Sequence, residues 1–345
     1  MSAPAAARAA PVPIAWDGRR LHALDQTLLP GRELWLELDG PRAVVDAIVR
    51  LAVRGAPLLG VVGGYGMAMA AARADDEDEL RSDAAALAAA RPTAVNLPRA
   101  VDRVLARALA APPAQHAAAA ARNEAEAIEA ENLAAGQALA ERGADLLGGA
   151  RRLLTHCNTG LLACGSRASG LGVVAALAER RDDLRVLVCE TRPLLQGARL
   201  TTWELARMGI EHELIVDAAA AGLIAAGEVD AVVTGFDRAA ANGDVANKVG
   251  TYGLALAASA TGIPLVVAGP CASIDASLPS GREIAIEQRG ADEVRQAMGE
   301  PTAPPGTACR NPAFDITPAA LIGALVTERG VAQPVNAATV AALMA

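Results

Sequence analysis

The chain has 345 residues, of which 52% are hydrophobic and 2% aromatic, and its net charge is −8. This length allows two domains and a sizeable core. The acidic balance argues against nucleic acid as the main partner, because neutralising phosphates requires clustered Lys and Arg side chains. An anionic small molecule needs only a local positive site, so the net charge leaves that class of substrate open.

The cysteines and the hydropathy pattern indicate in which compartment the chain is expected and whether it spans a membrane. Five cysteines without a Cys-x-x-Cys pair disfavour a disulfide framework and a structural zinc site, and they predict a cytoplasmic protein. Residues 1–13 are rich in Ala and Pro without a continuous apolar run, so we expect a disordered tail rather than a signal peptide. The longest apolar stretch, residues 253–270, is interrupted by Ser, Thr, Gly and Pro, so no membrane-spanning segment is expected.

Residues 14–147 are predicted to form a mostly helical N-terminal domain with a few short strands. Turn signals such as Asp17-Gly18 separate the strand-like pieces. From Pro41, Ala, Leu and Val recur at three- and four-residue spacing, which is typical of helices. The Glu-rich part 123–142 indicates a long, solvated amphipathic helix. The short strands are expected at residues 14–16, 20–24 and 34–38.

The chain changes character near Gly148, and residues 148–345 are predicted to form a Rossmann-like α/β domain. Apolar strands alternate there with helices such as 170–181 and 197–208. This alternation predicts a doubly wound parallel sheet, because parallel neighbours are joined by crossover helices. The strands are expected at residues 153–155, 186–188, 214–216, 229–233 and 263–268.

Segment 234–252 follows the predicted strand 229–233 and offers Asp237, Asn247 and Lys248 ahead of an Ala-rich helix. In an open α/β sheet, ligands bind in the loops beyond the carboxyl ends of the strands. We expect Asn247 and Lys248 to start the helix, where the helix dipole and the ammonium group both stabilise an anion. The segment therefore predicts the active-site loop of an enzyme.

Asp237 has two interpretations. Packed against Phe236 and apolar strands, its carboxyl group would have a raised proton affinity because of desolvation, and it would serve as a general acid at neutral pH. Alternatively, Asp237 caps the next turn through backbone N–H groups, which is the commoner role of an isolated Asp.

Cys157 lies in segment 155–160, at the carboxyl end of the first strand of the Rossmann-like domain. Near a helix N-terminus, this position favours a thiolate or a bound anion. A buried, inert cysteine is the alternative interpretation, and the two stay open. A protease-like Cys-His-Asn group is disfavoured, because the adjacent His156 would point away from Cys157.

A further candidate group follows the next strand, in segment 190–199. Its guanidinium and amide groups are suited to binding phosphate. The alternative is a Glu-Arg pair that fixes the loop, and the segment alone does not decide between the two. The candidate ligands are Arg192, Gln196 and Arg199.

The N-terminal half holds two more candidate anion sites. Arg54-Gly-Ala-Pro57 lies between two helices, where Pro57 suits a helix start and the backbone N–H groups beside Arg54 suit an anion. Arg91 stands beside another helix start, in segment 91–97. No glycine cluster matches a dinucleotide fingerprint or a phosphate loop, so neither NAD nor ATP is expected as a cofactor.

Taken together, these segments resemble the methylthioribose-1-phosphate isomerases of methionine salvage, part of a wider family that includes regulatory subunits of translation factor 2B. The resembling pieces occur in the family's order from Arg54 to Pro318, and they are specific as a set rather than singly. The pieces are Arg54-Gly-Ala-Pro, Arg91-Pro-Thr-Ala-Val-Asn-Leu, Thr155-His-Cys-Asn-Thr-Gly, Glu190-Thr-Arg-Pro-Leu-Leu-Gln-Gly-Ala-Arg-Leu-Thr, Asn242-Gly-Asp-Val-Ala-Asn-Lys-Val-Gly-Thr-Tyr and Asn311-Pro-Ala-Phe-Asp-Ile-Thr-Pro.

The resemblance implies an aldose–ketose isomerase that converts 5-methylthioribose 1-phosphate to 5-methylthioribulose 1-phosphate. It implies that Asp237 acts as an acid or base and that Cys157 relays a proton or stabilises charge. It also implies a homodimer that needs no cofactor or metal. Because the implied substrate contacts come from both halves of the chain, the site is expected in the cleft between them. These contacts are Arg54, Gly55, Ala56, Arg91, Gln196, Asn247 and Lys248.

Two alternatives remain beside this function. Departures from the family pattern at Phe236 and at Ser166-Arg167-Ala168 leave open a related sugar phosphate, such as 5-deoxyribose 1-phosphate, as the substrate. The second alternative is a non-catalytic regulatory subunit that binds a sugar phosphate or a nucleotide, although the presence of both Cys157 and Asp237 favours the enzyme. Proton transfer through an enol-phosphate and a direct hydride shift are both compatible with the sequence.

Overall fold

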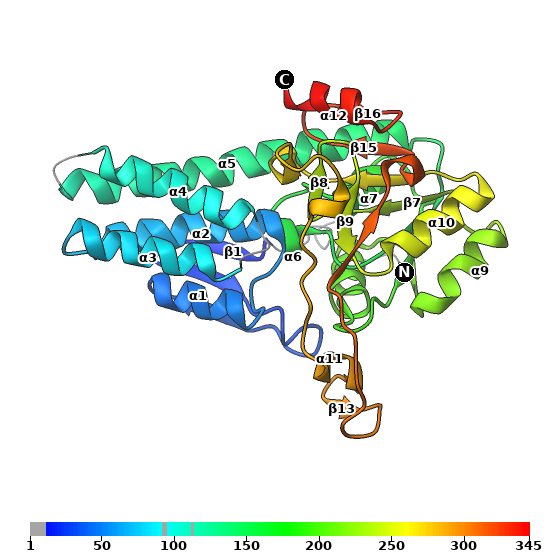
Figure 1. The fold of residues 1–345 in the computed structure, drawn as a ribbon, viewed down its shortest axis with the longest axis horizontal. Helices are drawn as coiled ribbons and strands as arrows, with labels where there is room; N and C mark the ends of the chain where they lie inside the picture. The colour runs from blue at the N-terminus through cyan, green and yellow to red at the C-terminus, as the bar shows by residue number, and fades with distance from the viewer. Residues whose placement is uncertain (1–11, 92–94, 112–113) are drawn as a thin grey trace. The chain divides into compact units, whose positions relative to one another are not determined.

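The computed structural model describes residues 12–91, 95–111 and 114–345, which form two compact units (Figure 1). The helical unit consists of residues 12–137 with Leu161–Ala168, and the sheet unit consists of Ala138–Gly160 with Ser169–Ala345. The units divide inside helix α5 (Ala114–Leu146), and the domain boundary expected near residue 148 stays a prediction. Residues 1–11 of the predicted tail, and Pro92 to Ala94 of segment 91–97, lie outside the described residues.

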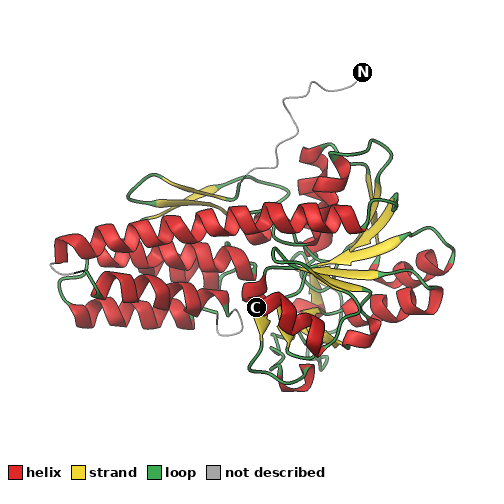
Figure 2. Ribbon diagram, turned by 90° about the horizontal axis from the view of Figure 1, so that it is seen from above, coloured by secondary structure: helices red, strands yellow, loops and turns green. Residues whose placement is uncertain are grey.

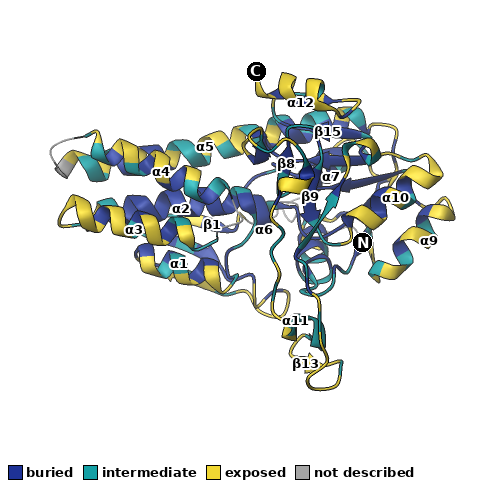
Figure 3. Ribbon diagram, viewed as in Figure 1, coloured by how far each residue is buried: buried dark blue, intermediate teal, exposed yellow. Residues whose placement is uncertain are grey.

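The helical unit begins with a three-stranded antiparallel sheet and continues with helices that pack around α2 (Ala56–Ala71). Nearly all of α2 is buried, because its small and aliphatic side chains allow neighbouring helices to approach on every side (Figure 3). The predicted short strands and helices are confirmed, and segment 123–142 lies within α5. The other elements are β1 (Ile14–Trp16), β2 (Leu21–Leu24), β3 (Trp35–Leu38), α1 (Pro41–Val49), α3 (Glu77–Ala89), α4 (Asn96–Leu109) and α6 (Leu161–Cys164).

A seven-stranded sheet forms the core of the sheet unit (Figure 2). All neighbouring strands are parallel except β15 and β16, which pair antiparallel at one edge of the sheet. The five strands expected from apolar runs are confirmed, and β15 and β16 were not expected. The spatial order is β16 (Val331–Ala332), β15 (Ala324–Val326), β10 (Leu265–Ala268), β7 (Ala231–Thr234), β4 (Arg152–Thr155), β5 (Arg185–Cys189) and β6 (His212–Ile215).

Helices cover both faces of this sheet, because alternate residues of each strand point to opposite faces. On one face, Leu153 and its neighbours pack with the end of α5, with α7 (Gly170–Ala178) and with α8 (Thr202–Met208). On the other face, Leu154 and its neighbours pack with α9 (Ala220–Ala225), α10 (Thr251–Thr261) and α12 (Ala337–Met344). The doubly wound, Rossmann-like sheet predicted from the sequence is therefore confirmed.

The order of strands reverses between β4 and β7. From β4 the chain proceeds to β5 and β6 on one side, and from β7 it proceeds to β10 and β15 on the other. In sheets of this kind, ligands bind beyond the carboxyl ends of the strands at the reversal. Cys157 comes shortly after β4 and Asp237 shortly after β7, so the fold brings both residues to this edge.

A second sheet, of four short strands, corrects one prediction. Asn247 and Lys248 belong to β9 (Val245–Lys248) and do not start the helix, because α10 begins at Thr251. β9 pairs antiparallel with β8 (Arg238–Ala240) and with β14 (Phe314–Thr317). The sequence of residues 245–248 does not indicate that this segment pairs with β14, which lies about 70 residues further along the chain.

The remaining short elements flank this second sheet. β11 (Ile274–Asp275) pairs with β8, and the short helix α11 (Asp292–Arg295) leads into the hairpin of β12 (Gln296–Ala297) and β13 (Glu300–Pro301). No helix within the described ranges is long and apolar enough to cross a membrane.

Candidate active site

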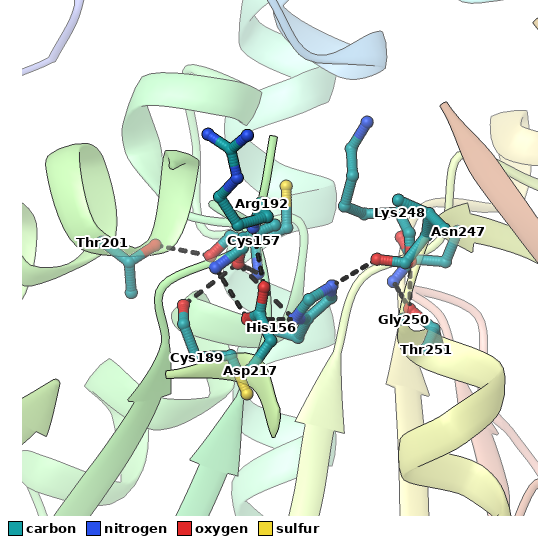
Figure 4. Close-up of polar contacts among 12 residues, drawn as sticks. His156, Cys157, Cys189, Arg192, Thr201, Asp217, Asn247, Lys248, Gly250 and Thr251 are labelled. Carbon is teal, nitrogen blue, oxygen red and sulfur yellow. Dashed lines mark hydrogen bonds and ion pairs between the residues drawn. The ribbon is translucent and has the colours of Figure 1, made fainter. Parts of the chain in front are cut away.

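Cys157 is held in an unusual backbone conformation just beyond β4. Its φ angle is 63°, in the left-handed region that non-glycine residues rarely adopt. Its N–H group donates to Thr191 Oγ1 at 2.8 Å, and its carbonyl oxygen accepts from Thr201 Oγ1 at 2.7 Å. In Figure 4, the sulfur of Cys157 points to the same side as the ends of Arg192 and Lys248, and away from the His156 ring. The side chain is thus directed beyond the sheet edge, and Cys157 is buried there, with 7% of its surface exposed.

His156 is buried beneath this loop and is engaged with the backbone. Its Nε2 lies 2.8 Å from the carbonyl oxygen of Val249, so Nε2 carries the ring proton and donates. Burial lowers the pKa of His156 below its ordinary value of 6.5, despite the opposing effects of this hydrogen bond and of Asp217. The ring is therefore neutral at neutral pH, and it is not placed as a base for Cys157.

The burial of His156 gives a testable dependence of stability on pH. In the folded chain the ring stays neutral below pH 6.5, whereas in the unfolded chain it takes up a proton, so unfolding is favoured as the pH falls. We expect the stability contribution to be complete above pH 6.5 and to decrease below it by up to about 1.4 kcal/mol per pH unit.

Urea unfolding between pH 7.5 and 5.5 checks this expectation, with His156→Gln as the comparison. The parent should lose more stability over this interval than His156→Gln, since the other titrating groups are common to both. Equal losses in the two proteins would mean that His156 titrates normally in the folded state.

The buried Cys189 and the partly exposed Asp217 complete a group around His156. The side-chain ligand atoms of these three residues all lie within 4.8 Å of one another. Asp217, however, accepts the N–H groups of Thr191 at 2.8 Å and Arg192 at 2.7 Å, and burial raises the pKa of the Cys189 thiol to about 12. A cysteine binds a metal ion as the deprotonated thiolate, and the raised pKa keeps Cys189 protonated. The three residues are therefore better suited to supporting the loop through hydrogen bonds than to binding a metal ion.

Asp237 enters the same edge of the sheet from β7. It follows Gly235 and Phe236, and Phe236 is buried as expected for an apolar neighbour. The N–H group of Asp237 donates to the carbonyl oxygen of Ala246 at 2.9 Å, which fixes the backbone against β9. Its carboxyl group is half-buried at the entrance to the β8–β9 hairpin.

Lys248 and Asn247 extend from β9 at the same edge. Lys248 Nζ donates to the carbonyl oxygen of Ala313 at 2.8 Å and lies 4.6 Å from the centroid of the Phe314 ring. The charge of Lys248 acts on the carboxyl groups of Glu293 and Asp315, but neither forms an ion pair with it in the part of the chain that the structure describes. Asn247 is buried, and its Nδ2 donates to Thr251 Oγ1 at 2.9 Å. In Figure 4 the ammonium end of Lys248 and the sulfur of Cys157 point to the same side, whereas the amide of Asn247 is turned to Thr251.

The segment after β5 supplies one free acceptor. Gln196 is 6% exposed, and among the described residues its Oε1 has no hydrogen-bond partner, a state that a buried acceptor rarely keeps without a ligand or water. The next residue, Gly197, must be glycine, because a Cβ at this position would lie 1.8 Å from the carbonyl oxygen of Cys189. Arg192, by contrast, donates to the carbonyl oxygens of residues 293, 294 and 296, so it fixes a loop.

The other four predicted contacts lie in the helical unit. Gly55 precedes α2 with φ of 100°, and a Cβ there would lie 2.2 Å from the carbonyl oxygen of Ala163, so the position requires glycine. Ala56 is the first residue of α2, and Arg54 comes directly before Gly55. Arg91 is half-buried ahead of α4. Both arginines thus stand at helix starts, and their contact with a substrate shared with the sheet unit stays a prediction.

Sequence reasoning missed the residues that support Cys157. Thr191 and Thr201 enter the sequence analysis only as parts of the motif 190–201, and Asp217 does not enter it. Asp217 comes just after β6, so the rule that functional side chains follow parallel strands would have found it. The two threonine hydroxyls carry no comparable signal in the sequence.

Comparisons with known proteins concern the sequence and the fold of the chain. Residues 52–334 match the model of the Initiation factor 2 subunit family. The chain is 49% identical to a methylthioribose-1-phosphate isomerase of Anaeromyxobacter sp. (strain K) over 333 residues, 96% of each chain. It superposes on the structure of 5-methylthioribose 1-phosphate isomerase from Pyrococcus horikoshii OT3 with a TM-score of 0.90 and 35% identity, covering 99% of this chain and 98% of that one.

A second solved structure carries a different description. It is the translation initiation factor eIF-2B, subunit delta, from A. fulgidus, with a TM-score of 0.84 and 39% identity, covering 96% of this chain and 99% of that one. Similar folds are thus found in a protein described as an isomerase and in one described as a translation initiation factor subunit.

Proposed function

Because this chain belongs to the Initiation factor 2 subunit family and is close in sequence to its methylthioribose-1-phosphate isomerases, we propose that it converts 5-methylthioribose 1-phosphate to 5-methylthioribulose 1-phosphate in methionine salvage. The enzyme is an aldose–ketose isomerase. One observation supports an active site in this chain: Cys157 follows β4 and Asp237 follows β7, the two strands between which the strand order reverses.

The substrate imposes the chemistry of this reaction. Its anomeric oxygen carries the phosphate, so the ring cannot open to a free aldehyde. The bond between the anomeric carbon C1 and the ring oxygen must break, the ring oxygen must gain a proton, and a hydrogen must move from C2 to C1. The C2 hydroxyl then loses its proton and becomes the ketone. One acid and one group that relays a proton or stabilises charge meet these needs.

We assign the acid to Asp237 and the second role to Cys157. A half-buried carboxyl group beside Phe236 suits protonation of the ring oxygen. The thiol of Cys157 points out of the same sheet edge, where it would relay the proton of an enol-phosphate route or stabilise the charge of a hydride shift. Both routes use the same two residues.

The substrate contacts follow from the remaining polar groups. Lys248 supplies charge for the phosphate and Asn247 an amide beside it. The buried Oε1 of Gln196 suits a sugar hydroxyl. From the helical unit, we propose that Arg54, Gly55, Ala56 and Arg91 complete the set through guanidinium and backbone N–H groups.

A homodimer in the cytoplasm is the further part of this proposal. The five cysteines form no disulfide and include no Cys-x-x-Cys pair, which supports a reducing compartment. The net charge of −8 supports a small sugar phosphate over nucleic acid as the partner. Light scattering of the purified chain measures the oligomeric state directly.

A turnover assay tests the proposed function. The full chain, without added cofactor, should form the ketose phosphate from 5-methylthioribose 1-phosphate. Repeating the assay with 5-deoxyribose 1-phosphate measures the preference for the sugar. Binding of both sugar phosphates without turnover would contradict the enzyme and would favour a regulatory subunit.

Replacing Lys248 tests phosphate capture. Because a hydrogen bond to a charged group is worth about 1.5–3 kcal/mol, Lys248→Ala should weaken binding of substrate and of inorganic phosphate by at least about tenfold. Calorimetry of both ligands measures this, and Arg142→Ala on α5 controls for the loss of one positive charge. Equal phosphate affinity in the parent and both variants would mean that Lys248 does not hold the phosphate.

A further inference from the structure

The peptide of Cys157 is held at both of its polar groups by threonine hydroxyls from two other segments. Thr191, after β5, accepts the N–H group at 2.8 Å, and Thr201, at the end of the π-helix Gly197–Thr201, donates to the carbonyl oxygen at 2.7 Å. Both threonines are buried, with 0% and 1% of their surface exposed. Water therefore does not compete for these two hydrogen bonds.

Each hydroxyl group also contacts partners other than Cys157. Thr191 Oγ1 donates to the carbonyl oxygen of Cys189 at 3.0 Å and lies 3.5 Å from His156 Nδ1, a second possible acceptor. Toward the Cys157 N–H group it accepts in either case. Thr201 Oγ1 gives its proton to Cys157, and it accepts from Asn158 Nδ2 at 3.2 Å. An acceptor thus meets the N–H group of Cys157 and a donor meets its carbonyl oxygen.

Thr191 is itself held in place. Its φ angle is 64°, also left-handed, and its N–H group donates to Asp217 Oδ1 at 2.8 Å. A left-handed non-glycine residue costs about 1–3 kcal/mol, and such residues persist where the surroundings over-determine them. Cys157 and Thr191, which are joined by a hydrogen bond, both have this unfavourable backbone conformation. They lie at the edge of the sheet where the substrate is expected.

We propose that Thr191 and Thr201 are positioning residues that hold the Cys157 backbone left-handed and thereby aim its thiol at the substrate. This inference rests on the proposed role of Cys157. It extends that role to two side chains that do not touch the substrate and act only through the Cys157 peptide. The hydroxyl groups, rather than the methyl groups, carry the effect.

Thr191→Val and Thr201→Val test the proposal, because valine keeps the shape and removes the hydroxyl. We expect kcat to fall by at least about tenfold with KM within about twofold, since small misplacements of a reacting group have large effects on rate. The pH profile of Cys157 modification by methyl methanethiosulfonate, followed by peptide mass spectrometry, should shift as well. Thr191→Ser and Thr201→Ser should restore both properties.

Thr202→Val is the matched control, since its hydroxyl bonds to the carbonyl oxygen of Ala198 and not to Cys157. Unchanged kcat per folded enzyme and an unchanged modification profile in both Val variants would overturn the proposal. Should Thr191→Val not fold, Thr201→Val and Thr201→Ala carry the same test. Full activity of Cys157→Ser would instead remove the catalytic role of the thiol, while the modification profile still reports whether the threonines position it.

Discussion

Asp237→Asn should lower kcat by at least about 10²-fold while changing KM only modestly, the usual scale for the loss of a general acid. Asparagine keeps the shape of the side chain and part of its hydrogen bonding, but it cannot give up a proton to the ring oxygen. The backbone of Asp237 is fixed by its hydrogen bond to Ala246, which the substitution leaves intact. The loss should therefore appear in the chemical step, measured as steady-state turnover of 5-methylthioribose 1-phosphate.

Asp244→Asn is the matched control on the same β8–β9 hairpin. The Asp244 carboxylate accepts from the N–H groups of Gly281 at 3.0 Å and Ala319 at 2.9 Å, so it ties the hairpin to two neighbouring segments. Its replacement should lower Tm and leave kcat per folded enzyme within about twofold. Full activity of Asp237→Asn would show that this carboxyl group only caps its turn.

Local pattern was sufficient for the main features of the fold. Each of β4, β5, β6, β7 and β10 is an apolar run between helical segments, and such runs identify buried parallel strands without any knowledge of the partner. The rule that ligands bind beyond strand ends then selected Cys157 and Asp237 as candidates, from two strands that proved to be neighbours.

Features that depend on distant partners were not predictable in this way. Lys248 was expected at a helix start, yet β9 is a strand because β8 and β14 pair with it on both sides. β15 is only three residues long, too short for its apolar run to be distinguished from other buried segments. The left-handed backbone of Cys157 depends on Thr191 and Thr201, whose hydroxyl groups come from separate segments.

Cys157→Ser should reduce turnover by about 10²-fold or more while leaving Tm nearly unchanged. Serine occupies almost the same volume and makes the same backbone hydrogen bonds with Thr191 and Thr201, so the loop should keep its conformation. A hydroxyl group, however, is a far weaker acid than a thiol, and it would neither relay a proton nor stabilise charge as the thiol does. Turnover per folded enzyme and thermal unfolding together separate these effects.

Cys189, at the end of β5, is the control for Cys157, and Cys189→Ser should change stability rather than rate. Cys189 is buried against the helices of one face of the sheet, where a hydroxyl group would be poorly accommodated. Its replacement should lower Tm and leave the rate per folded enzyme near that of the parent. If Cys157→Ser behaved in this way instead, with a large loss of stability and a normal rate, Cys157 would be a packing residue. Catalysis would then rest on Asp237 and on groups other than a thiol.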